Sequence, residues 1–153
     1  DGLATTSNIV GAKLYRQKKL FQLRELFKKL NILSWGLGFL FLVSFGVFWS
    51  QILSLFSTDS AVLKLTDSQW ILVVLTQPIN AYAFIVDGHL FGLGAFRSVR
   101  NMMMIGVLMI FIPLTFLQHI YPELWPVWVG FCALNLFRAL RGSFIVRRLI
   151  NGY

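Results

Sequence analysis

Four long apolar segments stand out along the sequence, at about residues 31–56, 69–96, 100–119 and 124–146. Each is long enough to cross the hydrocarbon core of a bilayer, for which a helix needs roughly 20 residues. Short loops separate them, and tryptophan and tyrosine side chains gather toward their ends, as they do where membrane helices meet water. The pattern predicts an all-α integral membrane protein with four transmembrane helices.

Two further elements are expected before the first span. Residues 1–12 mix small and polar side chains, and we interpret them as the end of a truncated transmembrane helix. Residues 13–30 are amphipathic, because four apolar side chains share one helical stripe while most of the basic side chains lie elsewhere. The stripe consists of Leu20, Leu23, Phe27 and Leu30. It predicts a cytoplasmic amphipathic helix that lies in the membrane interface.

Composition agrees with a membrane protein. The chain is 57% hydrophobic and 13% charged, and its mean hydropathy is +0.70. A soluble domain of 153 residues could not bury so much apolar surface, so membrane lipid is an expected partner. The net charge of +8 does not indicate nucleic acid, because the basic residues lie between apolar segments. The single cysteine, Cys132, lies inside an apolar segment and provides no disulfide framework.

The basic residues predict an orientation in the membrane. If the four spans alternate, all but Lys64 of the 14 lysines and arginines fall on one side. These are seven residues within 13–29, followed by Arg97, Arg100, Arg138, Arg141, Arg147 and Arg148. The positive-inside rule then places the amphipathic helix and the C-terminus in the cytoplasm. We expect a multi-pass protein of a bacterial inner (plasma) membrane or of an organellar membrane.

The second span carries the candidate functional residues. An ionisable group inside a span costs roughly 2.5–3.5 kcal/mol on insertion scales, which makes Asp87 a functional candidate. The spacing of Gln77, Asn80, Phe84 and Asp87 places them on one helix face, which should face a protein interior or a wet cavity. A carboxylate in such a place is suited to exchanging a proton for a charged substrate. The alternative is a structural acid held by hydrogen bonds or a salt bridge.

Other polar or special residues of the spans have more ordinary interpretations. Pro78 predicts a helix kink, which could be a hinge or a static feature. His89 points away from Asp87 on the helix, so packing is favoured over a shared proton relay. Arg138 is expected near the cytoplasmic end of its span, where its side chain can snorkel rather than bind substrate. Gly88 and Gly92 allow close helix contact.

Nothing in the sequence indicates an enzyme. There is no glycine-rich phosphate loop after a strand, and no serine, histidine and aspartate set in a recognisable order. Met102, Met103 and Met104 point in three directions, so they predict packing or lipid contact rather than a metal site. We therefore expect no catalytic residue, no metal and no cofactor.

Residues 77–94, QPINAYAFIVDGHLFGLG, resemble the tenth helix of multidrug and toxic compound extrusion (MATE) transporters of the DinF-like branch. The residues that match its pattern are Gln77, Pro78, Asn80, Ala81, Ala83, Phe84, Asp87, Gly88 and Gly92. The start of the chain is similar to the end of the family's eighth helix, although Tyr15 or Arg16 stands where a glycine is usual. The segments FSTDSAVLKL and LGAFRSVRN are similar to the loops after the ninth and tenth helices.

The resemblance implies the C-terminal portion of a twelve-helix, two-lobe MATE-type transporter, with the four spans as helices nine to twelve. It implies an antiporter that exports amphipathic or cationic organic compounds in exchange for protons or sodium ions by alternating access. Asp87 would take part in cation coupling, while Gln77, Asn80 and Phe84 would line the cavity. The partners would be a small organic substrate and the missing N-terminal helices. Asn80 stands where the NorM-like branch has an aspartate. This chain therefore lacks one acid of that branch's sodium site.

Two other functions remain open from the sequence. One is a flippase of the same superfamily for lipid-linked oligosaccharides or polysaccharides, which should have a cationic cavity for phosphate groups. The other is a non-transporting membrane scaffold, for which Asp87→Asn would leave all activity unchanged.

Overall fold

The structure, a computed structural model, describes residues 1–120 and 124–151, and these form helices joined by short turns and loops. The α-helices are α1 (Gly2–Arg16), α2 (Leu20–Val47), α3 (Trp49–Phe56), α4 (Ser60–Gly92), α5 (Phe96–Gly106), α6 (Ile112–Phe116) and α7 (Trp125–Asn151). A π-helical turn at Val107–Phe111 joins α5 to α6, and a 3-10 turn at Leu117–His119 follows α6. The expected all-α fold is confirmed.

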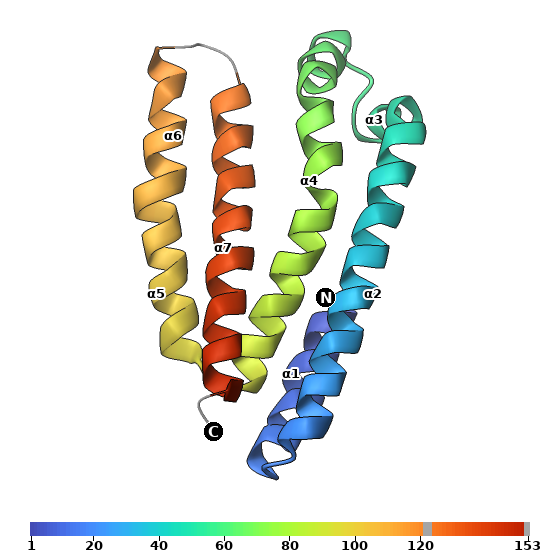
Figure 1. Cartoon of the computed structure of the whole chain (residues 1–153). Helices are drawn as coiled ribbons and strands as arrows, with labels where there is room; N and C mark the ends of the chain where they lie inside the picture. The colour runs from blue at the N-terminus through green and yellow to red at the C-terminus, as the bar shows by residue number, and fades with distance from the viewer. Residues whose placement is uncertain (121–123, 152–153) are drawn as a thin grey trace.

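Four helical stretches are long and apolar enough to cross a membrane: α2, α4, the continuous stretch Phe96–His119, and α7. Figure 1 shows that they run alternately up and down, with the α1–α2 turn, the α4–α5 turn and the end of α7 at the bottom. This arrangement confirms the four predicted spans. α4 lies at the centre and packs against α1, α2 and α7, while α5 and α6 pack on α7.

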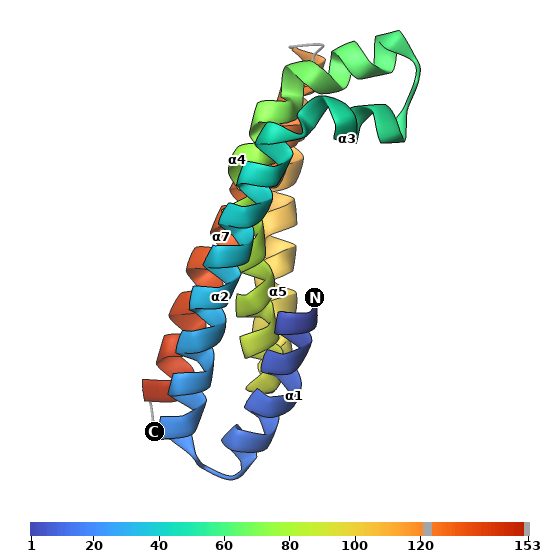
Figure 2. The ribbon, with the colours of Figure 1, turned by 90° about the vertical axis from the view of Figure 1, so that its right-hand side faces the viewer.

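Two span boundaries differ from the sequence-based expectation. α4 begins at Ser60 rather than near Gln69, because the Asp59 side chain accepts a hydrogen bond from the backbone N–H of Ala61 at 2.8 Å and caps the helix. The first span is interrupted at Phe48, after which α3 forms a separate short helix. Figure 2 shows α3 and the start of α4 leaning away from the axis of the longer helices.

The N-terminal region differs most from the expectation. Residues 13–30 do not form a separate interfacial helix: Arg16 ends α1, the chain turns at Lys18 with a φ of +57°, and α2 continues without a break to Val47. Figure 2 shows α1 beside the lower half of α2. The apolar stripe faces protein rather than lipid, since Leu23 is 0% exposed and Phe27 is 4% exposed within the main apolar core.

Small residues let α1 approach α4 closely, as the sequence suggested. A Cβ atom on Gly88 would lie 2.5 Å from the carbonyl oxygen of Ala4, and one on Gly92 would lie 2.9 Å from that of Ser7. Such distances exclude any side chain, so these two glycines fix how closely the two helices meet. The close packing holds His89 and Asp87, which are their neighbours on α4, against other helices.

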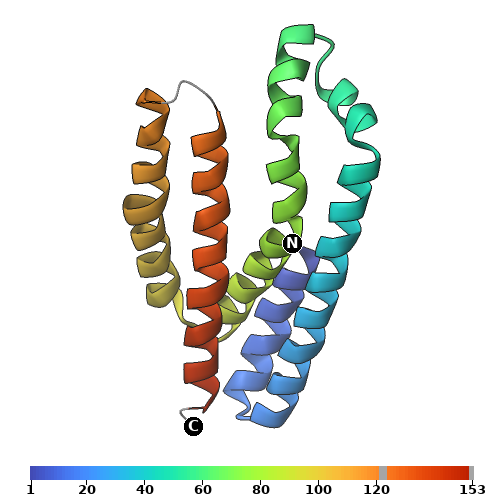
Figure 3. The ribbon, with the colours of Figure 1, turned by 45° about the horizontal axis from the view of Figure 1, so that its top comes forward.

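Prolines affect two of the spans. Pro78 lies inside α4 without ending it, and Figure 3 shows that α4 changes direction along its length. Pro113 lies in the first turn of α6, directly after the π-helical turn. Because proline clashes with the carbonyl four residues earlier, the wider π turn accommodates it within a continuous span. A hinge function for Pro78 remains a prediction.

Candidate functional site

Asp87 and Arg138 form a buried ion pair between α4 and α7. Nη2 of Arg138 donates to Oδ2 of Asp87, and each residue is only 8% exposed. Nη1 of Arg138 donates to Oδ1 of Asn135, one turn earlier on α7, at 2.7 Å. The pair links the second and fourth spans, so Asp87 has the salt-bridged environment that was one of the two alternatives from the sequence.

The expected position of Arg138 is wrong. α7 continues to Asn151, so the helix extends roughly 20 Å beyond Arg138 at a rise of 1.5 Å per residue. The side chain turns inward, where the residue is only 8% exposed, instead of snorkelling. There the Asp87 carboxylate neutralises it, and its Cζ atom lies 5.4 Å from the centroid of the Phe84 ring in a cation–π contact.

Three buried side-chain polar atoms of α4 and α7 have no hydrogen-bond partner among the described residues. They are Oδ1 of Asn80, Oδ1 of Asp87 and Nε of Arg138. Buried polar groups in proteins are nearly always paired, so three such atoms on two facing helices are unusual. Oδ1 of Asp87 can accept a proton or a hydrogen bond, and the Nε–H of Arg138 can donate a hydrogen bond to a water molecule or a ligand.

A cavity of about 800 Å³ lies between α4 and the helices α1 and α2. Gln77, Asn80 and Phe84 line it, together with the apolar side chains of Leu37 and Phe41. The side-chain amide of Gln77 donates to the carbonyl of Val73 on its own helix at 3.0 Å.

The predicted polar face is thus divided between two places. Three of its residues line the cavity, whereas Asp87 is not among the lining residues and faces α7. Phe84 belongs to both, because it lines the cavity and also lies under the guanidinium of Arg138. The functional roles of all four residues remain predictions.

His89 joins three helices through a second buried polar cluster. It is 1% exposed, its Nδ1 atom is hydrogen-bonded to Oγ of Ser7 on α1, and its Nε2 atom is 2.9 Å from Oδ1 of Asn31 on α2. Its ring stacks on Phe27 with the centroids 3.8 Å apart. These contacts agree with a packing role, away from Asp87. Sequence reasoning missed the contributions of Ser7 and Asn31, because partners 82 and 58 residues away leave no local pattern.

Replacing His89 with alanine should destabilise the full-length protein by about 2 kcal/mol, since it removes a stacked ring and leaves the Ser7 hydroxyl without its partner. Thermal unfolding in detergent would measure the change. The matched control is His119→Ala, because His119 is exposed and should be replaceable with little effect. Equal unfolding temperatures for the two variants would contradict the structural role of His89.

The fold and the buried ion pair between spans define a multi-pass helical membrane protein. Comparison with known families is more specific: the profile of the MatE family matches residues 2–117, so the chain belongs to the MatE family of transporters. It is 35% identical over 148 residues to Protein DETOXIFICATION 44, chloroplastic, of Arabidopsis thaliana, which covers 92% of this chain. It is also 34% identical over 109 residues to Protein DETOXIFICATION 45, chloroplastic, of the same plant, which covers 68% of this chain.

The chain matches only part of these relatives, with 26% of the first and 18% of the second covered. No solved structure matches the chain significantly. The assignment to the DinF-like branch remains a prediction.

Proposed function

We propose that this chain forms four helices of a larger MATE-type antiporter, which exports amphipathic or cationic organic compounds by alternating access. The further helices, on which alternating access depends, would come from the rest of such a transporter. The observation that carries the proposal is the buried pair of Asp87 and Arg138, which leaves Oδ1 of the carboxylate without a partner. Charged groups inside a membrane span are expensive, and coupling is a common reason to retain them.

The ion pair favours protons over sodium as the coupling ion. A sodium ion at the Asp87 carboxylate would lie beside the positive guanidinium of Arg138, which repels it. A proton can instead add to the unpartnered Oδ1 and remove the negative charge that holds Arg138 in place. The contact between α4 and α7 would then weaken, and the two helices could change their arrangement. Protonation would in this way be linked to movement of the spans.

The cavity between α4, α1 and α2 fits an amphipathic organic substrate. Gln77 and Asn80 contribute amide groups, while Phe84 and Phe41 offer flat apolar surfaces. Ligand sites of this kind combine a mainly apolar lining with a few polar groups that orient the ligand. The described residues that line the cavity include no lysine or arginine side chain, so it does not have the cationic character that a flippase for phosphate-bearing lipids would need.

The location and orientation are also proposals. The names of both relatives contain the word chloroplastic, which supports an organellar membrane over a bacterial inner membrane. The basic α1–α2 turn, the α4–α5 turn and the end of α7 lie at one end of the bundle (Figure 1). The positive-inside rule places that end, with the C-terminal end of α7, on the cytoplasmic or equivalent side.

Replacing Asp87 with asparagine in the full-length protein should abolish substrate-induced proton movement. The amide has nearly the shape of the carboxylic acid but cannot gain or lose a proton at this site. The measurement is the pH inside proteoliposomes that contain a pH-sensitive dye, after addition of a fluorescent organic cation. Asp67→Asn is the matched control, because Asp67 is an exposed acid on the first turns of α4 and should retain exchange.

The outcomes separate the candidate functions. Proton movement that persists in the Asp87→Asn variant would contradict the coupling role of Asp87. Transport by the unmodified protein that depends on sodium and not on protons would contradict the proposal that the coupling ion is a proton. Transport of a lipid-linked sugar instead of the organic cation would favour the flippase. No transport by the unmodified full-length protein would favour the scaffold.

A further inference from the structure

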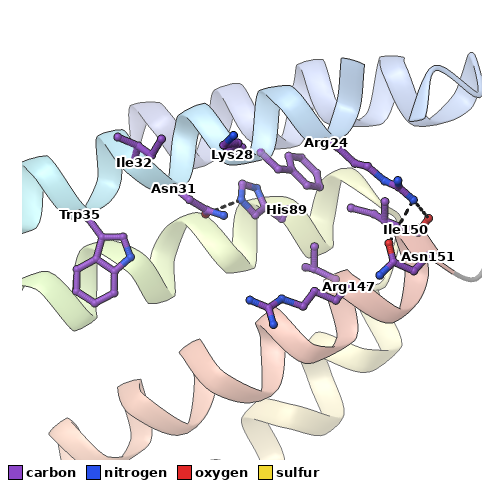
Figure 4. A pocket seen from close by; sticks show the side chains of 11 residues that line it. Arg24, Lys28, Asn31, Ile32, Trp35, His89, Arg147, Ile150 and Asn151 are labelled. Carbon is purple, nitrogen blue, oxygen red and sulfur yellow. Dashed lines mark hydrogen bonds between the residues drawn. The ribbon is translucent and has the colours of Figure 1, made fainter. Parts of the chain in front are cut away.

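A basic groove lies between the first turns of α2 and the last turns of α7, with α4 beneath it (Figure 4). Its volume is about 460 Å³. It lies at the end of the bundle that holds the α1–α2 turn and the C-terminal end of α7 (Figure 1). The groove is separate from the cavity at Gln77 and Asn80 and from the ion pair of Asp87, since none of these residues lines it.

The charge of the groove is positive. Arg24 and Lys28 line it from α2 and Arg147 lines it from α7, and the described lining residues include no acid. Arg24 donates to the carbonyl of Ile150 and to Oδ1 of Asn151, at 3.2 Å each, and so ties the two helices together. Lys28 and Arg147 form no hydrogen bond or ion pair with any described residue. The groove thus has one unpaired cation on each of the two helices that form its walls.

The apolar part of the groove continues directly from these cations. Lys28, Ile32 and Trp35 are spaced by four and three residues, so they follow one another along a single face of α2. The distance from the first to the last is roughly 10 Å along the helix axis at 1.5 Å per residue. Ile32 is 64% exposed and Trp35 is 39% exposed, and the Trp35 ring stacks on Tyr82 of α4. Figure 4 shows Trp35 and Arg24 at opposite ends of the groove, with the guanidinium of Arg147 on the side toward Trp35.

We infer that this groove binds an anionic phospholipid of the surrounding leaflet. The phosphate would lie between Lys28 and Arg147, and an acyl chain would extend over Ile32 and Trp35 toward the middle of the bilayer. Basic grooves between membrane helices on the positively charged side are suited to anionic headgroups. A soluble phosphate would use the cations alone, whereas the exposed apolar strip beside them is explained by the acyl chain of a lipid.

The bound lipid would hold α2 and α7 together. Its headgroup would bridge Lys28 and Arg147 beside the direct contact that Arg24 makes with Ile150. The groove also reaches His89, which joins α4 to α1 and α2. Lipid at this place would therefore stabilise the meeting point of the helices at the basic end of the bundle.

The test is native mass spectrometry of the full-length protein in detergent, titrated with short-chain phosphatidylglycerol. Phosphatidylcholine of the same chain length and glycerol phosphate are the comparison ligands, since the first lacks net charge and the second lacks acyl chains. We expect tight binding of phosphatidylglycerol and weak binding of the other two. Lys28→Gln/Arg147→Gln should weaken phosphatidylglycerol binding roughly 30-fold, because each basic residue near an anionic lipid contributes about 5-fold.

The matched control is Lys29→Gln/Arg97→Gln, which removes the same charge at the same end of the bundle from residues that do not line the groove. Equal weakening in both double variants would overturn the inference in favour of general attraction to a basic surface. Binding of glycerol phosphate as tight as that of phosphatidylglycerol would overturn it in favour of a soluble anion.

A second measurement needs no substitution and so does not depend on the folding of a variant. Phosphatidylglycerol with a photoreactive group on its acyl chain should cross-link the unmodified full-length protein at Ile32 or Trp35, as mapped by peptide mass spectrometry. Cross-links spread evenly over the lipid-facing side chains of α2 and α5 would contradict a specific groove. Neither experiment requires transport activity, so failure of the antiport proposal would leave this inference standing.

Discussion

Replacing Arg138 with glutamine should lower the free energy of unfolding of the full-length protein by about 3–5 kcal/mol, because it leaves the buried Asp87 carboxylate without its counter-charge. Asp87→Asn should have a similar effect by leaving the guanidinium unpaired. The double variant Asp87→Asn/Arg138→Gln should be considerably more stable than either single variant, since two neutral amides need no counter-charge. Unfolding by a denaturing detergent in mixed micelles, followed by circular dichroism, would measure all three.

The control is Arg141→Gln, one turn further along α7. Arg141 is exposed and lies over the ring of Phe144, with its Cζ atom 5.7 Å from the centroid. Arg141→Gln should lower the free energy of unfolding by less than about 1 kcal/mol. If Arg138→Gln were no more destabilising than Arg141→Gln, the buried pair would not be present in the full-length protein.

The double variant also separates stability from transport. If Asp87 and Arg138 served only to hold α4 against α7, restoring stability would restore proton-coupled transport as well. If Asp87 carries the coupled proton, the double variant should be stable and correctly inserted but inactive in exchange. The same protein preparation can be used for both measurements, so a loss of exchange cannot be attributed to misfolding.

The spans and the polar face could be predicted because each depends on short-range pattern. Hydropathy over about 20 residues identifies a membrane helix whatever its neighbours are, and the spacing of Gln77, Asn80 and Phe84 predicts that they share a helix face. The structure places these three residues together at one cavity.

The features that could not be predicted depend on which helices meet. The Leu23 and Phe27 stripe is equally compatible with lipid and with protein as its neighbour, and only the turn at Lys18 decides that it faces the protein core. The position of Arg138 in the sequence, three residues before Arg141, does not show that its side chain meets Asp87 of another helix 51 residues away. One local signal was available: Asn135 precedes Arg138 by one helical turn, and a polar pair on one face of a span indicates a protein neighbour.

Replacing Gly38 with alanine should destabilise the full-length protein by about 2–3 kcal/mol, although the same change usually favours a helix. A Cβ atom on Gly38 would lie 2.5 Å from the Cα atom of Pro78 and 3.2 Å from the carbonyl oxygen of Gln77. These are backbone atoms of α4 and cannot rotate aside, so the two helices would have to separate at the proline. The shift would fall beside the cavity that Gln77 and Asn80 line, and transport should decrease together with stability.

Gly36 provides the matched control two residues away on the same helix. Nothing lies within 4 Å of the position that its Cβ atom would occupy, so Gly36→Ala should be neutral or stabilise the protein by up to about 1 kcal/mol through helix propensity. Unfolding in mixed micelles and initial transport rates in proteoliposomes would be compared for both variants. Equal stability of Gly36→Ala and Gly38→Ala would mean that α2 and α4 are further apart in the full-length protein. A stable Gly38→Ala variant with reduced transport would instead indicate that contact with Pro78 matters mainly for the movement of α4.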